Sequence, residues 1–136
     1  EAIADADAVL IAPSNPVVSV GPVLAVPGIR EALAAAAAPV VGVSGIISGG
    51  VVRGMADACL AAIGVETSAE AVGRLYGARD AGGVLDGWLV DEADDDAVAP
   101  LERAGIATRS VPLWMRDADT SAQLAADALE LSAALR

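Results

Sequence analysis

Residues 7–22 read DAVLIAPSNPVVSVGP, an apolar run that stops at a cluster of turn-forming residues. The run Asp7–Pro13 is continuously apolar after its first residue, which is typical of a strand buried on both faces of a parallel sheet. The serine, asparagine and prolines that follow predict a stiff loop at the carboxyl end of that strand. The fold therefore begins, on this interpretation, with one buried strand and one ordered loop.

The rest of the chain repeats this alternation of short apolar runs and helical patterns. Further strands are predicted at Pro39–Ser44, Val84–Asp91 and Ala107–Val111. Helices are predicted at Val23–Ala38 with a break at Pro27-Gly28, Met55–Ile63, Thr67–Tyr76, Asp95–Ala104 and from Thr120 onward, with capping boxes at Thr67-x-x-Glu70 and Thr120-x-x-Gln123. On the last helix Leu124, Ala128, Leu131 and Leu135 share one face. The alternation predicts an α/β, Rossmann-like three-layer sandwich with a mainly parallel sheet of about four strands.

Composition narrows the class of protein further. The 136 residues are 55% hydrophobic and carry a formal charge of −11, with no lysine and no histidine, so the chain is a folded domain and an unfavourable partner for nucleic acid. No apolar run approaches the roughly 20 residues that span a bilayer, and no basic segment precedes the first one. A single cysteine, Cys59, fits a reducing compartment. We expect a cytoplasmic protein without membrane contact.

The loop Pro13–Pro22 is the first candidate site, because ligands of open α/β sheets bind beyond the carboxyl ends of the strands. Its polar side chains and backbone amides suit a phosphate group. The alternative is a tight turn in which Asn15 bonds its own backbone. The candidate residues are Ser14, Asn15, Pro16, Ser19 and Gly21.

The glycine-rich loop after the second strand is the other candidate. Its candidate residues are Ser44, Gly45, Arg53 and Gly54. The glycines let a phosphate approach the backbone closely, and Arg53 can contact it with two parallel hydrogen bonds. The loop has neither the lysine of a P-loop nor the spacing of a dinucleotide-binding motif. Asp57 is a weak candidate for a metal ligand, with a surface ion pair to Arg53 as the alternative.

Two further features have simple structural interpretations. The acidic segment 91–96 follows the third strand, where carboxylates often hold Mg²⁺, but it is more typical of a solvated helix cap. Trp88 and Trp114 are interpreted as core residues.

Four ordered stretches carry a resemblance to a known family. They are Asp7–Leu33 (DAVLIAPSNPVVSVGPVLAVPGIREAL), Ala38–Asp57 (APVVGVSGIISGGVVRGMAD), Gly83–Glu92 (GVLDGWLVDE) and Pro112–Asp117 (PLWMRD). Together they resemble the C-terminal part of the 2-phospho-L-lactate transferases of coenzyme F-420 biosynthesis. Residues 1–136 are thus expected to be the C-terminal part of a longer transferase domain whose N-terminal half is absent.

The resemblance implies a reaction and its partners. A phospholactyl or phosphoenolpyruvyl group would pass from a diphosphoguanosine donor to 7,8-didemethyl-8-hydroxy-5-deazariboflavin, releasing GMP, with Mg²⁺ as cofactor and a homodimer as a possible assembly. It implies that the first loop holds the diphosphate or guanosine side, while Ser44, Gly45, Arg53 and Gly54 complete the nucleotide cleft. The catalytic and metal-binding carboxylates would lie in the absent half, so this chain alone is expected to bind weakly and to be inactive.

Two departures and two rivals accompany the resemblance. Gly45 stands where the family commonly has proline, and the family's glycine-rich first loop is missing. Gluconeogenesis-factor proteins, which bind nucleotide sugars as regulators, share the architecture but have a glycine-rich loop in place of Ser14-Asn15-Pro16. A non-catalytic α/β interaction domain is the other alternative.

Overall fold

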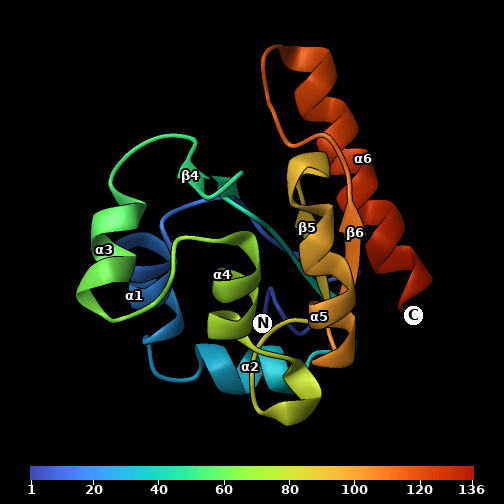
Figure 1. Ribbon diagram of the computed structural model, residues 1–136. Helices are drawn as coiled ribbons and strands as arrows, with labels where there is room; N and C mark the ends of the chain where they lie inside the picture. The colour runs from blue at the N-terminus through green and yellow to red at the C-terminus, as the bar shows by residue number, and fades with distance from the viewer.

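The computed structural model describes all residues 1–136 and contains the predicted parallel sheet. Its strands are β1 (Val9–Ile11), β2 (Val40–Val43), β5 (Gly87–Val90) and β6 (Ala107–Ser110), hydrogen-bonded side by side in the order β1-β2-β5-β6 with every pair parallel. Helices flank this sheet on both faces (Figure 1). The predicted α/β, Rossmann-like architecture is confirmed, and each strand lies within one of the four predicted runs.

The connections between the strands are mostly helical. The helices are η1 (Pro16–Val20), α1 (Gly21–Leu24), α2 (Ile29–Ala35), α3 (Ala56–Ala62), α4 (Ala69–Tyr76), η2 (Arg79–Ala81), η3 (Glu92–Ala97), α5 (Val98–Arg103) and α6 (Ala118–Ala134). A small antiparallel hairpin, β3 (Ile46–Ile47) and β4 (Gly50–Val51), follows β2. No single helix has the length and apolarity needed to cross a membrane; only the pair Pro16–Leu24 and Ile29–Ala35, bent by 77°, meets both criteria when taken together.

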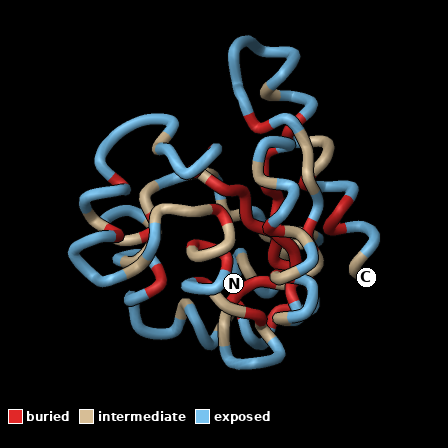
Figure 2. The backbone as a smooth tube through the Cα atoms, in the orientation of Figure 1, coloured by how far each residue is buried: buried red, intermediate tan, exposed pale blue.

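The two faces of the sheet bury two separate clusters, because successive side chains of a strand point to opposite faces. Val40 and Trp88 belong to the larger cluster, which includes residues of α3, α4 and α5. Val41 and Leu89 belong to the smaller cluster, which α6 covers with the predicted face of Leu124, Ala128 and Leu131. Buried backbone is concentrated along the sheet and the elements next to it (Figure 2).

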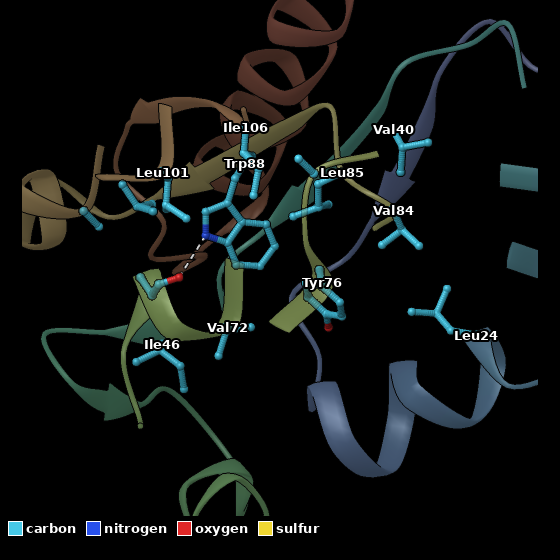
Figure 3. Packing of buried hydrophobic residues seen from close by; sticks show 14 of the residues in the cluster. Leu24, Val40, Ile46, Val72, Tyr76, Val84, Leu85, Trp88, Leu101 and Ile106 are labelled. Carbon is cyan, nitrogen blue, oxygen red and sulfur yellow. Dashed lines mark hydrogen bonds between the residues drawn. The ribbon is translucent and has the colours of Figure 1, made fainter. Parts of the chain in front are cut away.

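Trp88 is the centre of the larger cluster and is only 1% exposed. Its indole Nε1 donates a hydrogen bond to the carbonyl of Ala69, 3.2 Å away, which ties the start of α4 to β5 (Figure 3). Two glycines make room for the ring: a Cβ on Gly42 would lie 2.6 Å from it, and one on Gly73 would lie 3.2 Å from Nε1. The core interpretation of Trp88 is therefore confirmed.

Both candidate loops contain secondary structure that the sequence interpretation left out. Pro16 begins a five-residue π-helix that runs into α1, where the stiff loop Pro13–Pro22 was expected. Proline suits this position because the first turn of a helix has no partner for its backbone N–H. In the second loop, Ser48 and Gly49 both have positive φ, 53° and 70°, and make the two-residue turn of the β3–β4 hairpin.

The predicted helix starts need correction at both capping boxes. Ser68, rather than Thr67, caps α4 by accepting a hydrogen bond from the Ala71 amide. Asp117 caps α6, so this helix begins before the predicted Thr120, which itself completes the capping box. In both cases two nearby residues have side chains that can cap a helix, Thr67 and Ser68 in one and Asp117 and Thr120 in the other. The prediction from sequence spacing assigned the cap to the wrong residue of each pair.

The remaining helix boundaries differ less. The break at Pro27-Gly28 is confirmed, and α2 then ends at Ala35 instead of Ala38. The helix predicted from Asp95 is a 3-10 segment, η3, followed by α5 from Val98.

Candidate functional site

A cavity of about 380 Å³ opens at the carboxyl ends of the strands, and its lining is mostly apolar. This volume lies in the range of small-molecule sites. The lining residues come from the β1–η1 loop, the β2–β3 loop and hairpin, the β4–α3 loop, α4, β5 and the segment after β6: Pro13, Ser14, Asn15, Pro16, Val43, Ser44, Gly45, Ile46, Ile47, Val51, Val52, Arg53, Ala56, Val72, Tyr76, Trp88, Leu113, Trp114 and Met115.

The structure brings the two predicted loops to this one cavity. Both contribute three of the predicted site residues to its lining: Ser14, Asn15 and Pro16 from the first, and Ser44, Gly45 and Arg53 from the second. The loops meet because they leave the neighbouring parallel strands β1 and β2 at the same edge. A Cβ on Gly45 would lie 3.8 Å from the backbone of Ser14.

The other predicted site residues lie outside this lining. Ser19, on η1, faces a second groove of about 410 Å³ that runs along β1 and is lined mainly by aliphatic side chains. Gly21 is the first residue of α1, where a Cβ would come within 3.0 Å of the Pro16 carbonyl. Gly54 is exposed with a φ of 95°, and Asp57 is exposed on α3.

The polar side chains of two cavity residues form hydrogen bonds within the chain. Asn15 Oδ1 accepts hydrogen bonds from the amides of Val17 and Val18, and its Nδ2 donates to Cys59 Sγ. The buried Ser44 hydroxyl donates to the Ile46 carbonyl and accepts from the Ile46 amide. Both side chains therefore fix the shape of the loops, as the turn alternative for Asn15 expected.

Other polar groups at the cavity have no partner in the chain. The Arg53 guanidinium forms no ion pair or hydrogen bond, and it is the only charged group in the lining. The backbone amides of Ser14, Asn15 and Gly45 donate no hydrogen bond within the chain. A cation and several free N–H groups around a cavity without carboxylates suit an anionic ligand, although the whole chain carries a charge of −11.

The carboxylates of this chain do not form a metal site. Arg53 and Asp57 make no ion pair, and no group of three His, Cys, Asp or Glu residues is placed to hold a metal ion. The chain therefore contains no three-ligand metal centre of its own, and both Mg²⁺ and Asp57 as its ligand stay predictions.

The acidic segment after β5 holds two walls of the cavity in place. The buried carboxylate of Asp91 accepts from the Leu113 amide at 2.9 Å, which fixes the segment that leads to Trp114. Asp94 accepts from the Ser48 amide at 2.9 and 3.1 Å, which fixes the tip of the β3–β4 hairpin. These carboxylates act as braces, which the sequence did not predict. Asp91 also caps η3 by accepting a hydrogen bond from the Ala93 amide at 3.1 Å, so the helix-cap interpretation is confirmed for this residue, which is buried rather than solvated.

Three of the lining residues that sequence reasoning left out of the site are Trp114, Met115 and Tyr76. Trp114, interpreted as a core residue, is 44% exposed and stands at the cavity beside the half-exposed Met115, so that interpretation is wrong. The sequence signals for Trp114 and Met115 were their position just after the fourth strand and their place in the PLWMRD stretch. Tyr76, the last residue of α4, is 6% exposed and lines the cavity, and burial raises the pKa of its hydroxyl to about 12.

A parallel α/β sheet with a largely apolar, cation-bearing cavity at the carboxyl ends of its strands is typical of α/β proteins that bind small molecules. The particular family follows from sequence comparison. The model of the 2-phospho-L-lactate transferase family CofD matches residues 1–128, so the chain belongs to this family.

Individual relatives agree with the family match. A phosphoenolpyruvate transferase from Kitasatospora aureofaciens is 60% identical over all 136 residues of the chain and 41% of the relative's own length. The phosphoenolpyruvate transferase of Mycobacterium ulcerans is 60% identical over 96% of the chain and 38% of the relative. The one from Streptomyces coelicolor is 56% identical over 100% of the chain and 41% of the relative. The chain thus spans about 40% of the length of the curated relatives that it matches.

Proposed function

We propose that this chain forms the donor-binding part of a transferase of coenzyme F-420 biosynthesis. The donor is a diphosphoguanosine that carries an enolpyruvyl or lactyl group, and the acceptor is 7,8-didemethyl-8-hydroxy-5-deazariboflavin. The relatives named phosphoenolpyruvate transferases favour the enolpyruvyl form. The observation that carries the proposal is the unpaired Arg53 beside free backbone amides at the rim of a cavity.

The cavity lining offers two kinds of chemistry. Arg53 and the amides of Ser14, Asn15 and Gly45 supply donors for the diphosphate of the donor nucleotide. The exposed faces of Trp114 and Met115 supply an apolar surface on which a planar ring can stack. A nucleotide needs both kinds of surface, which is why the arrangement favours it over a simple inorganic anion.

In the proposed reaction the terminal ribityl hydroxyl of the acceptor attacks the phosphorus that bears the enolpyruvyl or lactyl group. A new oxygen–phosphorus bond forms, the bond from this phosphorus to the GMP phosphate oxygen breaks, and the hydroxyl proton passes to a base. Such transfer depends on alignment of the reactants and on neutralisation of phosphate charge, which Arg53 serves. The cavity lining contains no carboxylate or histidine, so the base comes from elsewhere in the enzyme.

The test is calorimetric titration of the chain with GDP, in the presence and absence of MgCl₂, for the wild type and Arg53→Ala. We expect weak GDP binding by the wild type and roughly tenfold weaker binding by the variant, because a charge-assisted contact is lost. Arg103→Ala is the matched control, since Arg103 is exposed on α5 and lies outside the cavity lining.

Each rival function has its own outcome. Equal GDP affinity of wild type and Arg53→Ala would contradict the site. Tighter binding of a UDP-sugar than of GDP would favour the regulator of the gluconeogenesis-factor type, and binding of neither would favour an interaction domain. The homodimer, the cytoplasmic location, the use of Mg²⁺ and the place of this chain in the C-terminal part of the enzyme rest on the resemblance and stay predictions.

A further inference from the structure

The hydroxyl of Tyr76 is a polar group that the protein leaves without a partner. Tyr76 is only 6% exposed and lines the cavity, yet its hydroxyl oxygen makes no hydrogen bond with any residue. Among side-chain polar atoms fully sealed from solvent, only Ser132 Oγ lacks a partner. The Tyr76 oxygen therefore keeps some exposure, and the residue that carries it lines the cavity.

The ring that carries this hydroxyl is held firmly. It packs edge-on against Trp88, with ring centroids 5.6 Å apart and planes at 66°. Trp88 is itself fixed by its hydrogen bond to the first turn of α4, the helix that Tyr76 ends. In Figure 3 the Tyr76 oxygen lies at the end of its ring away from Trp88. A fixed ring presents its hydroxyl in one direction, which is what selective recognition requires.

We propose that the Tyr76 hydroxyl is a specificity-determining group that hydrogen-bonds an edge atom, a carbonyl oxygen or ring nitrogen, of a planar heterocycle bound in the cavity. This inference rests on the proposed function, because both of its substrates carry such a heterocycle.

The cavity wall to which Tyr76 belongs favours a neutral ring edge over a phosphate. The apolar lining residues that share its buried cluster are Ile46, Ala56, Val72 and Trp88. The only cation of the lining, Arg53, lies on an exposed loop. An anion beside an apolar wall loses its hydration without compensation, whereas one neutral hydrogen bond satisfies a ring carbonyl. The raised pKa of about 12 keeps the hydroxyl protonated and able to donate at physiological pH.

The experiment measures binding of two probes, GDP with MgCl₂ and 7,8-didemethyl-8-hydroxy-5-deazariboflavin, to the wild-type chain and to Tyr76→Phe. The variant keeps the ring and removes only the oxygen. We expect about five- to tenfold weaker binding of one probe, which identifies the ring that Tyr76 reads, and a melting temperature unchanged within about 1 °C.

Ser132→Ala is the matched control, because Ser132 is 1% exposed on α6, also has an unpartnered hydroxyl, and lies on the opposite face of the sheet. It should leave both affinities unchanged. Tyr76 is the only tyrosine of the chain, so incorporation of 3-fluorotyrosine gives one ¹⁹F resonance that reports on this position alone. That resonance should move when the probe binds.

The outcomes separate the two proposals. If the wild type binds a probe and Tyr76→Phe binds each probe as tightly as the wild type does, the role of Tyr76 is refuted and the proposed function stands. The same conclusion follows if the ¹⁹F resonance does not move when the probe binds. If Tyr76→Phe melts at a clearly lower temperature, the hydroxyl has a structural partner and the inference also fails. If the wild type binds neither probe, the proposed function fails and the role of Tyr76 fails with it.

Discussion

The two ends of the parallel sheet treat their polar groups in opposite ways. At the amino end, Asp86 accepts a hydrogen bond from the Val40 amide at 2.7 Å and pairs with Arg79 at 2.8 Å. The Arg79 guanidinium also donates to three backbone carbonyls at and beyond the end of α2, each at 3.1 Å: Leu33, Ala36 and Ala38. At this end the chain satisfies its own charges.

At the carboxyl end the arginine and several donors remain free. Arg53 has no carboxylate partner, three backbone amides have no acceptor, and the Tyr76 hydroxyl points to no protein atom within hydrogen-bond distance. Folded proteins pair nearly all of their buried polar groups, so the unpaired hydroxyl of the buried Tyr76 indicates a ligand. Arg53 and the three amides are exposed or half-buried and remain free to bind one. The same residue type, arginine, is thus structural at one end and available for binding at the other.

Among tests of this contrast, the substitution Arg79→Ala has the largest expected effect. The substitution leaves the largely buried Asp86 carboxylate and the carbonyls near the end of α2 without their donor, so we expect a loss of about 3 kcal/mol in the free energy of unfolding. Chemical denaturation measures it. Arg53→Ala should change the same quantity by less than about 0.5 kcal/mol. Equal losses in the two variants would erase the distinction between the two ends.

A smaller effect is expected from Asp91→Ala, which removes one brace of the carboxyl end. The buried amide of Leu113 loses its acceptor, so the free energy of unfolding should fall by about 2 kcal/mol. The released segment carries Trp114, whose fluorescence should become more accessible to acrylamide. Asp96→Ala, an exposed change in the same acidic segment, is the control and should alter neither quantity. Unchanged quenching in Asp91→Ala would show that the brace does not position Trp114.

The smallest effect concerns the start of α6. Hydrogen bonds from Thr120, first from its amide and then from its hydroxyl, lower the pKa of the capping Asp117. Because this pKa is lower in the folded state, the ionised Asp117 stabilises the helix start fully at pH values above its ordinary pKa near 4. This contribution is lost as the pH falls through the folded-state pKa. The protection factor of the Thr120 amide, which corrects its exchange rate for the intrinsic effect of pH, should therefore fall below about pH 4. Asp117→Asn retains a capping oxygen that does not titrate, so its exchange should lack this dependence; identical profiles would contradict the role of Asp117.

The sheet and the meeting of the two loops were predictable from sequence, because both depend on local patterns. Apolar runs such as Pro39–Ser44 report burial on two faces directly, and parallel strands bring their carboxyl ends to one edge by geometry alone. The family resemblance carried by the PSNPVVSVGP block is likewise confirmed by the match over residues 1–128.

Side-chain roles in the site were less predictable, because they depend on partners far away in the sequence. Asn15 bonds Cys59, Asp94 reaches Ser48, and Asp91 reaches Leu113. No local pattern indicates such pairs. The Ser44 hydroxyl is hydrogen-bonded within the chain and the Tyr76 hydroxyl is not. This difference depends on which groups the tertiary structure places within hydrogen-bonding distance.

The covering of the smaller hydrophobic cluster by α6 has a consequence for how the chain folds during synthesis. Val41 and Leu89 are synthesised before residues 118–134, the helix that covers them in the folded protein. One face of the sheet is consequently still bare when all four strands have left the ribosome. A nascent chain in which residues 118–134 are still inside the ribosome would expose this aliphatic surface to chaperones.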